Sequence, residues 1–259
     1  MRKINIIIAF LAVLSLPSKL ISQYSELEVK NMISQATEKE MVVQCSRMLQ
    51  ENFFHFADLI TDALLKTNPK SANYKYRKGF IELTMRQNYT KAIDLFVSST
   101  GSINQNYDMF SIKESAVPAD IFFHLGHAYH LNEEFDNAIK NYNKFLEMTR
   151  KDSELIEYAE RGIAQCDVAK NLMKNPKDVI IENLGDSINT EFADFSSNIS
   201  LDGRALYYTS RRPWADGASN GFKDPMMDYY PEDIYQATLS KEDIWMSPLK
   251  MDLCKPNFN

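Results

Sequence analysis

The sequence predicts an α+β protein in two parts, a solenoid of helical repeats followed by one four-stranded blade of a β-propeller. Residues 26–175 contain few Gly or Pro and place apolar residues at helical spacing. Ala57, Ala92 and Ala138 stand at matching places in three successive segments of this region. After Asn183, short β-favouring runs alternate with turn residues. The first two observations predict the helical repeats, and the third predicts the blade.

The first 22 residues have the layout of a secretory signal peptide. Arg2 and Lys3 precede an apolar run, Ile4–Leu16, and small or polar residues follow it. The run is shorter than the ~20 residues that span a bilayer. We expect cleavage near Ser22 and an exported protein; an unprocessed hydrophobic first helix is the alternative interpretation.

The helical part repeats in its apolar positions as well as in its alanines. Four and seven residues after the three alanines come Thr61 and Leu64, Phe96 and Ser99, and Tyr142 and Phe145. Gly79 and Gly126 lie in two of the preceding helices, where a small residue lets helices cross closely while the aromatic residues fill the space between hairpins. The spacing of the first two alanines fits a ~34-residue repeat. The wider second spacing requires an extra loop, which Thr100–Pro118 supplies.

These positions resemble the tetratricopeptide repeat. The series Phe122-x-x-Leu125-Gly126-x-x-Tyr129, followed by Phe135-x-x-Ala138-x-x-x-Tyr142-x-x-Phe145, fills nearly every signature position. Ala57–Pro69 resembles half a repeat, Tyr74–Ser99 another repeat with Lys78 where Leu is usual, and Ser153–Lys174 a final helix or half-repeat. The resemblance implies a tetratricopeptide domain over residues 24–177.

Residues 178–259 predict the blade. The expected strands are Ser196–Ser200, Ala205–Ser210, Ile234–Thr238 and Ile244–Met246. Gly203 supplies the positive φ of the first turn, and Leu206 and Tyr208 share one face of the second strand. One blade takes ~40–50 residues and a propeller needs at least ~4 blades. We therefore expect the chain to be a fragment, a truncated product or half of a split assembly.

Together with the run Asp202-Gly203…Leu206-Tyr207-Tyr208-Thr209-Ser210-Arg211, the repeats resemble a family of Bacteroidetes envelope proteins. Its members, including the PorE-like proteins of type IX secretion, combine a signal peptide, tetratricopeptide repeats, a TolB/WD-like propeller and an OmpA-like domain. The resemblance implies a non-enzymatic protein–protein scaffold at the periplasmic face of the outer membrane. This sequence has no lipoprotein cysteine and no OmpA-like segment. Peptidoglycan binding would thus require a further C-terminal domain, and membrane association rests on analogy alone.

His124, His127 and His130 recur every three residues on one predicted helix. A metal site is conceivable, but no Cys or carboxylate in register completes a ligand set. The repeat register instead predicts that Phe123, His127 and His130 line a concave groove that binds other envelope proteins or peptides. Phe122, Leu125 and Tyr129 would pack inward.

A second expected surface lies on the blade, in the loop that starts with Arg211, Arg212 and Trp214. A cation–π contact between Arg and Trp is one reading of this loop. Its acids could also hold calcium, although no EF-hand spacing supports that, and a solvated loop is the expected state. This surface suits the alternative function, an accessory propeller protein that binds glycans or peptides.

Several classes of function are disfavoured by composition and motifs. A pI of about 5.3 argues against nucleic-acid binding. The sequence has no Gly-rich phosphate loop and no Gly-x-Ser-x-Gly elbow, so we expect neither catalysis nor a cofactor. The N-terminal part of a propeller-containing hydrolase remains an alternative. Cys45, Cys166 and Cys254 match no metal motif; we expect Cys45 and Cys166 to be buried thiols, with a disulfide between them as the alternative.

Overall fold

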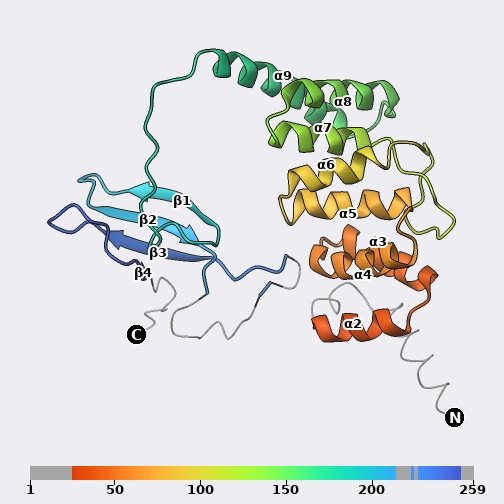
Figure 1. Cartoon of the computed structure of the whole chain (residues 1–259), viewed down its shortest axis with the longest axis horizontal. Coiled ribbons are helices and arrows are strands. Elements are labelled where there is room, and N and C mark those ends of the chain that lie inside the picture. Colours follow the sequence, from red (N-terminus) through yellow and green to blue (C-terminus); the bar gives the residue numbers. More distant parts are fainter. Residues whose placement is uncertain (1–24, 214–222, 225–226, 252–259) are drawn as a thin grey trace, which may run out of the picture. The chain divides into compact units, whose positions relative to one another are not determined.

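The computed structural model describes residues 25–213, 223–224 and 227–251. The predicted signal peptide, Trp214 and Cys254 lie outside them. The chain divides into two compact units, Met1–Pro176 and Lys177–Asn259. In the described part, the first unit contains eight helices and the second a four-stranded antiparallel sheet (Figure 1). The molecule is therefore of the α+β class that the sequence predicts.

The helices of the first unit pack in chain order, and three pairs joined by turns of three or four residues form a stack (Figure 1). Reciprocal capping boxes, Ser25 with Glu28 and Thr37 with Glu40, begin the first two helices. The pairs are α3 with α4, α5 with α6, and α7 with α8. The helices are α2 (Glu26–Gln35), α3 (Glu38–Gln50), α4 (Phe54–Thr67), α5 (Ala72–Thr84), α6 (Tyr89–Val97), α7 (Ile121–Leu131), α8 (Phe135–Met148) and α9 (Leu155–Lys174).

The turns within the three pairs share one backbone geometry. Asn52, Gln87 and Glu133 each adopt a positive φ, at 62°, 52° and 62°, two residues before the next helix begins. A left-handed conformation costs a non-glycine residue about 1–2 kcal/mol. The same cost recurs at the same place in each pair, so the three pairs repeat in structure as well as in sequence.

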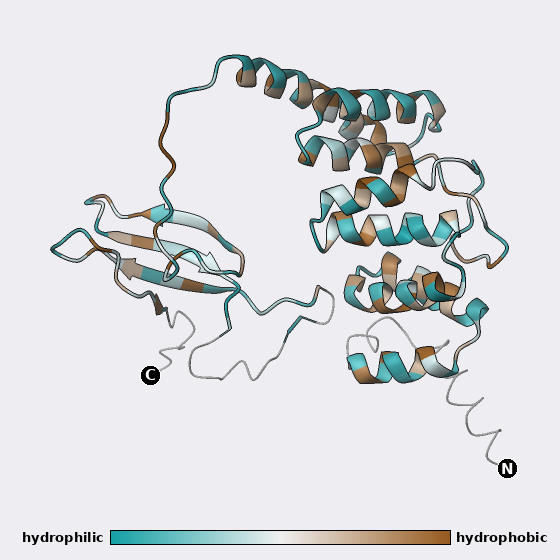
Figure 2. Cartoon of the chain, viewed as in Figure 1, coloured by the Kyte–Doolittle hydropathy of each residue, from teal (hydrophilic) through white to brown (hydrophobic). Residues whose placement is uncertain are grey.

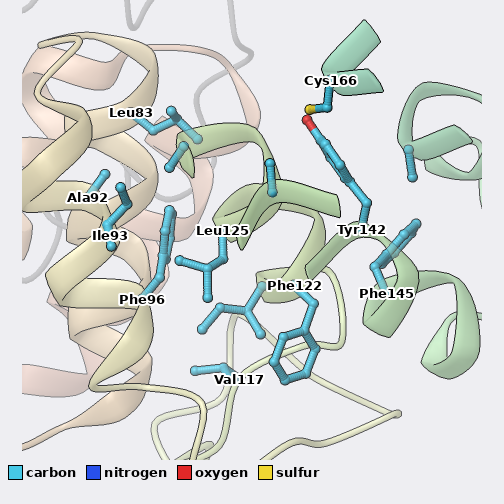
Figure 3. Packing of buried hydrophobic residues seen from close by; sticks show 14 residues of the cluster. Leu83, Ala92, Ile93, Phe96, Val117, Phe122, Leu125, Tyr142, Phe145 and Cys166 are labelled. Carbon is cyan, nitrogen blue, oxygen red and sulfur yellow. The ribbon is translucent and has the colours of Figure 1, made fainter. Parts of the chain in front are cut away.

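Glycine–aromatic contacts set the distance between neighbouring helices. A Cβ added at Gly79 would lie 2.8 Å from Phe96, and one at Gly126 would lie 2.8 Å from Tyr142. The predicted close crossings are thus confirmed. Gly162 of α9 repeats the contact on the other side of the Tyr142 ring, at 2.7 Å. Figure 3 shows this ring reaching from α8, with its hydroxyl pointing toward the sulfur of Cys166.

The predicted apolar positions form the core of the helical unit. The three repeat alanines and the residues four and seven positions after each are all buried, as expected. Cys45 and Cys166 are buried free thiols rather than disulfide partners. Phe96, Tyr142 and Phe145 belong to one cluster of buried hydrophobic residues, which Figure 3 shows.

Lys78 occupies a position where the repeat resemblance leads one to expect Leu, and it is buried. Its ammonium lies 2.5 Å from the carboxylate of Asp58 and 2.7 Å from that of Asp62. Burial alone would lower the pKa of Lys78, but the hydrogen bonds to these two carboxylates raise it. An ion cluster between α4 and α5 therefore replaces the expected apolar contact.

The second unit has strands β1 (Asp194–Ile199), β2 (Ala205–Ser210), β3 (Asp233–Thr238) and β4 (Leu249–Lys250), in that spatial order. Gly203 has a φ of 73°, as its turn requires. Leu206 and Tyr208 share the buried face of β2, which confirms the predicted alternation. The connection from α9 to β1 carries the exposed apolar run Val179–Ile181, brown in Figure 2.

The prediction of the fourth strand at Ile244–Met246 is wrong. Trp245 makes an isolated bridge to Leu239, and the named strand is Leu249–Lys250, which pairs with β3. Pro248 has no N–H to donate between the two pairings, which interrupts the ladder. The first strand also begins two residues earlier than expected, with an irregular register between Phe195 and Asn198.

Replacing Gly126 by Ala tests the glycine–aromatic packing. Helix propensity favours Ala by about 1 kcal/mol. The Tyr142 ring, however, also abuts Gly162 and cannot retreat from the new methyl group. We expect Gly126→Ala to lower the free energy of unfolding by about 1–3 kcal/mol in urea denaturation. The matched control is Gly101→Ala, because a Cβ there meets nothing within 4 Å; equal effects of the two changes would contradict the packing argument.

Candidate functional site

The predicted binding residues lie on α7 in one helical register. Asp120, directly before the helix, and Phe123, His127 and His130 follow each other at three- or four-residue steps, so they share one face. His127 is exposed, whereas Phe123 and His130 are half-buried. We call these four residues the α7 face.

Phe123 and His130 also belong to the packing of the stack. The ring of Phe123 lies 5.6 Å from that of Phe145, and the ring of His130 lies 6.0 Å from that of Phe135. Burial lowers the pKa of His130; burial and the neighbouring charge of His130 lower that of His127. The α7 face is thus neutral and partly aromatic at pH 7, apart from Asp120. Its use as a partner-binding surface stays a prediction.

His124, the third histidine of the series, lies in an aromatic cluster. Its ring is 5.0 Å from Phe80, 6.1 Å from Tyr76 and 6.2 Å from Phe96. Burial lowers the pKa of His124 to about 4, so the ring is neutral at pH 7. Within the described residues, no group of three or more His, Cys, Asp or Glu side chains is placed to hold a metal ion.

The segment between α6 and α7 forms a compact loop rather than an open connection. Ile103 bridges Val117, and backbone hydrogen bonds join Asn104 to Val117 and Val117 to Ser102. Such closure of two ends over a 6–16-residue excursion is typical of an Ω-loop. We call residues 102–117 the closed loop.

Arg77 of α5 attaches the closed loop to the helices. Its side chain is 1% exposed and donates to the carbonyl of Met109 in the loop at 2.5 Å. It also donates to Oδ1 of Asn73 at 3.0 Å and to Oγ of Ser46 at 2.9 Å. Ser46 in turn donates to the same Met109 carbonyl. A buried guanidinium satisfied by neutral acceptors therefore fixes the middle of the loop over α3 and α5.

A pocket of about 370 Å³ opens where the closed loop, the start of α7 and the α8–α9 connection meet. This volume lies within the range of small-ligand sites. Gln105 joins two of the walls, because its side-chain amide donates to the carbonyl of Met148 at 3.1 Å. The lining residues are Asn104, Gln105, Tyr107, Pro118, Ala119, Asp120, Thr149, Arg150, Asp152 and Ser153.

Asp120 links the pocket to the α7 face. Burial raises the pKa of its carboxyl group, and among the described residues no hydrogen bond or ion pair compensates that burial. Arg150, by contrast, lies 3.5 Å from Asp152, and both side chains are largely exposed. A half-buried carboxylate without a partner in a cavity is a feature of functional sites.

The other predicted surface, on the sheet unit, consists of arginines that are engaged within that unit. Arg211 pairs with Glu232, and its guanidinium lies 3.7 Å from the ring centre of Tyr229. The expected Arg–Trp contact cannot be placed, because Trp214 lies outside the described residues. The binding role of this loop therefore stays a prediction.

Arg212 clamps the segment before β1 to the sheet. It donates to the carbonyls of Ser187 and Ile188 at 2.9 Å and pairs with Asp194 at 3.0 Å. Its guanidinium also lies 4.9 Å from the ring centre of Tyr235. These contacts show that Arg212 has a structural role in the sheet unit. The sequence pattern alone did not separate this role from that of an exposed surface residue.

None of the helices in the described ranges has both the length and the apolarity that crossing a bilayer requires. Two side chains that build the site, Arg77 and Asp120, were missed by sequence reasoning. An Arg on an otherwise inward-facing helix position is the one signal that could have indicated the first of them.

Arg77→Met should release the closed loop. The change removes charged hydrogen bonds that hold Met109 and Ser46, and we expect a loss of about 3 kcal/mol in the free energy of unfolding. Amide exchange in residues 102–117 should accelerate before the helices open. Lys140→Met, at an exposed position of α8, is the control. Unchanged exchange in the loop of the Arg77 variant would rule out this anchoring role.

His124 predicts a pH dependence of stability. Its folded pKa of about 4 lies below the ordinary 6.5, so its contribution is complete above pH 6.5 and is lost as the pH falls toward 4. At pH 4.5, His124→Phe should recover roughly 2 kcal/mol relative to the unmodified protein. Urea unfolding at pH 7.0 and 4.5 measures this difference. His127→Phe, at an exposed position, should recover much less.

Comparison of the chain with protein-family models and with curated proteins finds no match. No relative thus supplies a function by similarity. The functional argument rests on the repeated packing of the helices, the α7 face and the adjoining pocket.

Proposed function

We propose that this protein is an exported, non-enzymatic scaffold of the bacterial cell envelope that binds other proteins through its helical unit. In this proposal the helix pairs are a tetratricopeptide solenoid, and the sheet is the first blade of a β-propeller. The scaffold would act at the periplasmic face of the outer membrane, within a secretion or peptidoglycan-linked assembly.

The observation that carries the proposal is the repetition of one packing unit. Gly79 with Phe96 and Gly126 with Tyr142 make the same close contact in consecutive pairs. The left-handed turn residues recur at the same place in three pairs. Stacked units of this kind present extended surfaces, and binding partners along such surfaces is their usual role.

The α7 face is the part of the stack best suited to a partner. His127 is exposed beside the half-buried ring of Phe123, 6.3 Å away, which offers an aromatic contact at little conformational cost. The neutral imidazoles can accept or donate hydrogen bonds. On the sheet unit, by comparison, Arg211 and Arg212 are already engaged in internal contacts.

Site-specific crosslinking tests this function. A photoreactive phenylalanine analogue at position 127 should give a defined adduct in cells of the source organism, in the envelope fraction. The matched control places the same analogue at Lys140, an exposed position on α8 outside the α7 face. Mass spectrometry of the adduct identifies the partner.

With the partner in hand, His127→Ala should weaken binding about fivefold to tenfold, as truncation of a moderate interface contact does. Calorimetry measures the change. Absence of any adduct at position 127, or equal adducts at 127 and 140, would contradict the proposed surface. Recovery of the protein with residues 1–22 intact in the cytoplasmic fraction would contradict export.

A further inference from the structure

The pocket beside the α7 face has a distinct chemical preference. We propose that it binds the side chain of a lysine or arginine of the partner protein, with Asp120 as the counter-ion. The inference rests on the proposed function, since it assigns part of the partner's chemistry to a defined place on the same surface.

Charge gives the first argument. Four lining groups can ionise: Asp120, Arg150, Asp152 and Tyr107. Arg150 and Asp152 pair with each other, and the raised pKa of Tyr107 keeps its phenol neutral. The remaining charge is the carboxylate of Asp120. A group brought into the pocket therefore meets one negative charge.

Hydrogen-bonding capacity gives the second argument. The hydroxyl of Tyr107 donates to Oδ1 of Asn73 at 2.8 Å and accepts from Arg77, so it offers no donor to the pocket. The amide of Asn104 donates to Glu114 at 2.6 Å, and that of Gln105 donates to Met148 at 3.1 Å. Tyr107, Asn104 and Gln105 thus use these donors within the protein rather than in the pocket. An ammonium or guanidinium, which carries only donors, complements the acceptors that are left.

The shape of the site gives the third argument. Pro118, Ala119 and Tyr107 contribute the smaller, carbon part of a lining that is mostly polar. Lysine and arginine bury an aliphatic stem and place their charge at its end, so they match this combination of walls. A compact hydrated cation would use the carboxylate alone.

The helical register then sets the position of the cationic residue within a partner segment. Asp120 and His127 are seven residues apart along the helix, a rise of about 10 Å. An extended chain covers about 3.3 Å per residue. The cationic residue should therefore lie about three positions from the partner residue that contacts His127.

Titration of the full-length mature protein with N-acetyl-lysine N-methylamide tests the pocket. Amide chemical shifts of residues 104–107, 119–121 and 149–153 should move together, with a Kd on the order of millimolar for so small a ligand. N-acetyl-arginine N-methylamide should act similarly. The neutral isostere N-acetyl-norleucine N-methylamide should bind at least tenfold more weakly. Equal binding of the neutral compound, or no shifts with either cation, would overturn the proposal.

Asp120→Asn should weaken lysine-amide binding at least tenfold, whereas Glu154→Gln, an exposed carboxylate close to the pocket in sequence, should change it less than twofold. The Asp120 variant should melt at the same or a higher temperature, because it removes a desolvated charge without a partner. A lower melting temperature would mean that the carboxylate has a structural role, and would overturn the proposal. If the lysine amide binds but no adduct forms at position 127, the cation preference of the pocket is supported and only the proposed function is contradicted.

Discussion

The close contact between a helical glycine and an aromatic ring is the constraint on which the helical unit depends. At Gly126 and Gly162 the same ring, that of Tyr142, is held from both sides. A single methyl group at either place would force α7 or α9 away from α8. The interhelix distance set here also determines where Phe123 and His130 lie, because both pack against α8 or residues at its start.

The pocket is a second consequence of this packing. Its walls come from the closed loop, the start of α7 and the α8–α9 connection, and the close packing of α7 and α8 helps to bring them together. Arg77 then holds the middle of the closed loop through the Met109 carbonyl. Burying a guanidinium among neutral acceptors is costly, and the hydrogen bonds that Arg77 donates to Asn73, Ser46 and Met109 offset that cost.

Much of the fold could be predicted because the type of residue at particular positions determines how the helices and strands pack. Ala138, Gly126 and Tyr142 are at the expected places, and the alternation in β2 follows from Leu206 and Tyr208. The site could be predicted only in part. The acceptor for Arg77 is a backbone carbonyl, which has no sequence signature, and the isolation of Asp120 depends on walls that no local pattern reveals. The fourth strand was misplaced because Pro248 divides its pairing into two short parts.

The closed loop connects helix pairs that are not neighbours. Met109 is bound to Ser46 and Arg77, on α3 and α5, and Gln105 is bound to Met148 at the end of α8. In an ordinary repeat stack each unit contacts only its neighbours, so only the contacts between adjacent units resist bending. Here one loop braces the first pair against the third. Bending that separates those pairs must break hydrogen bonds of the loop, so the loop resists bending together with the contacts between adjacent helices.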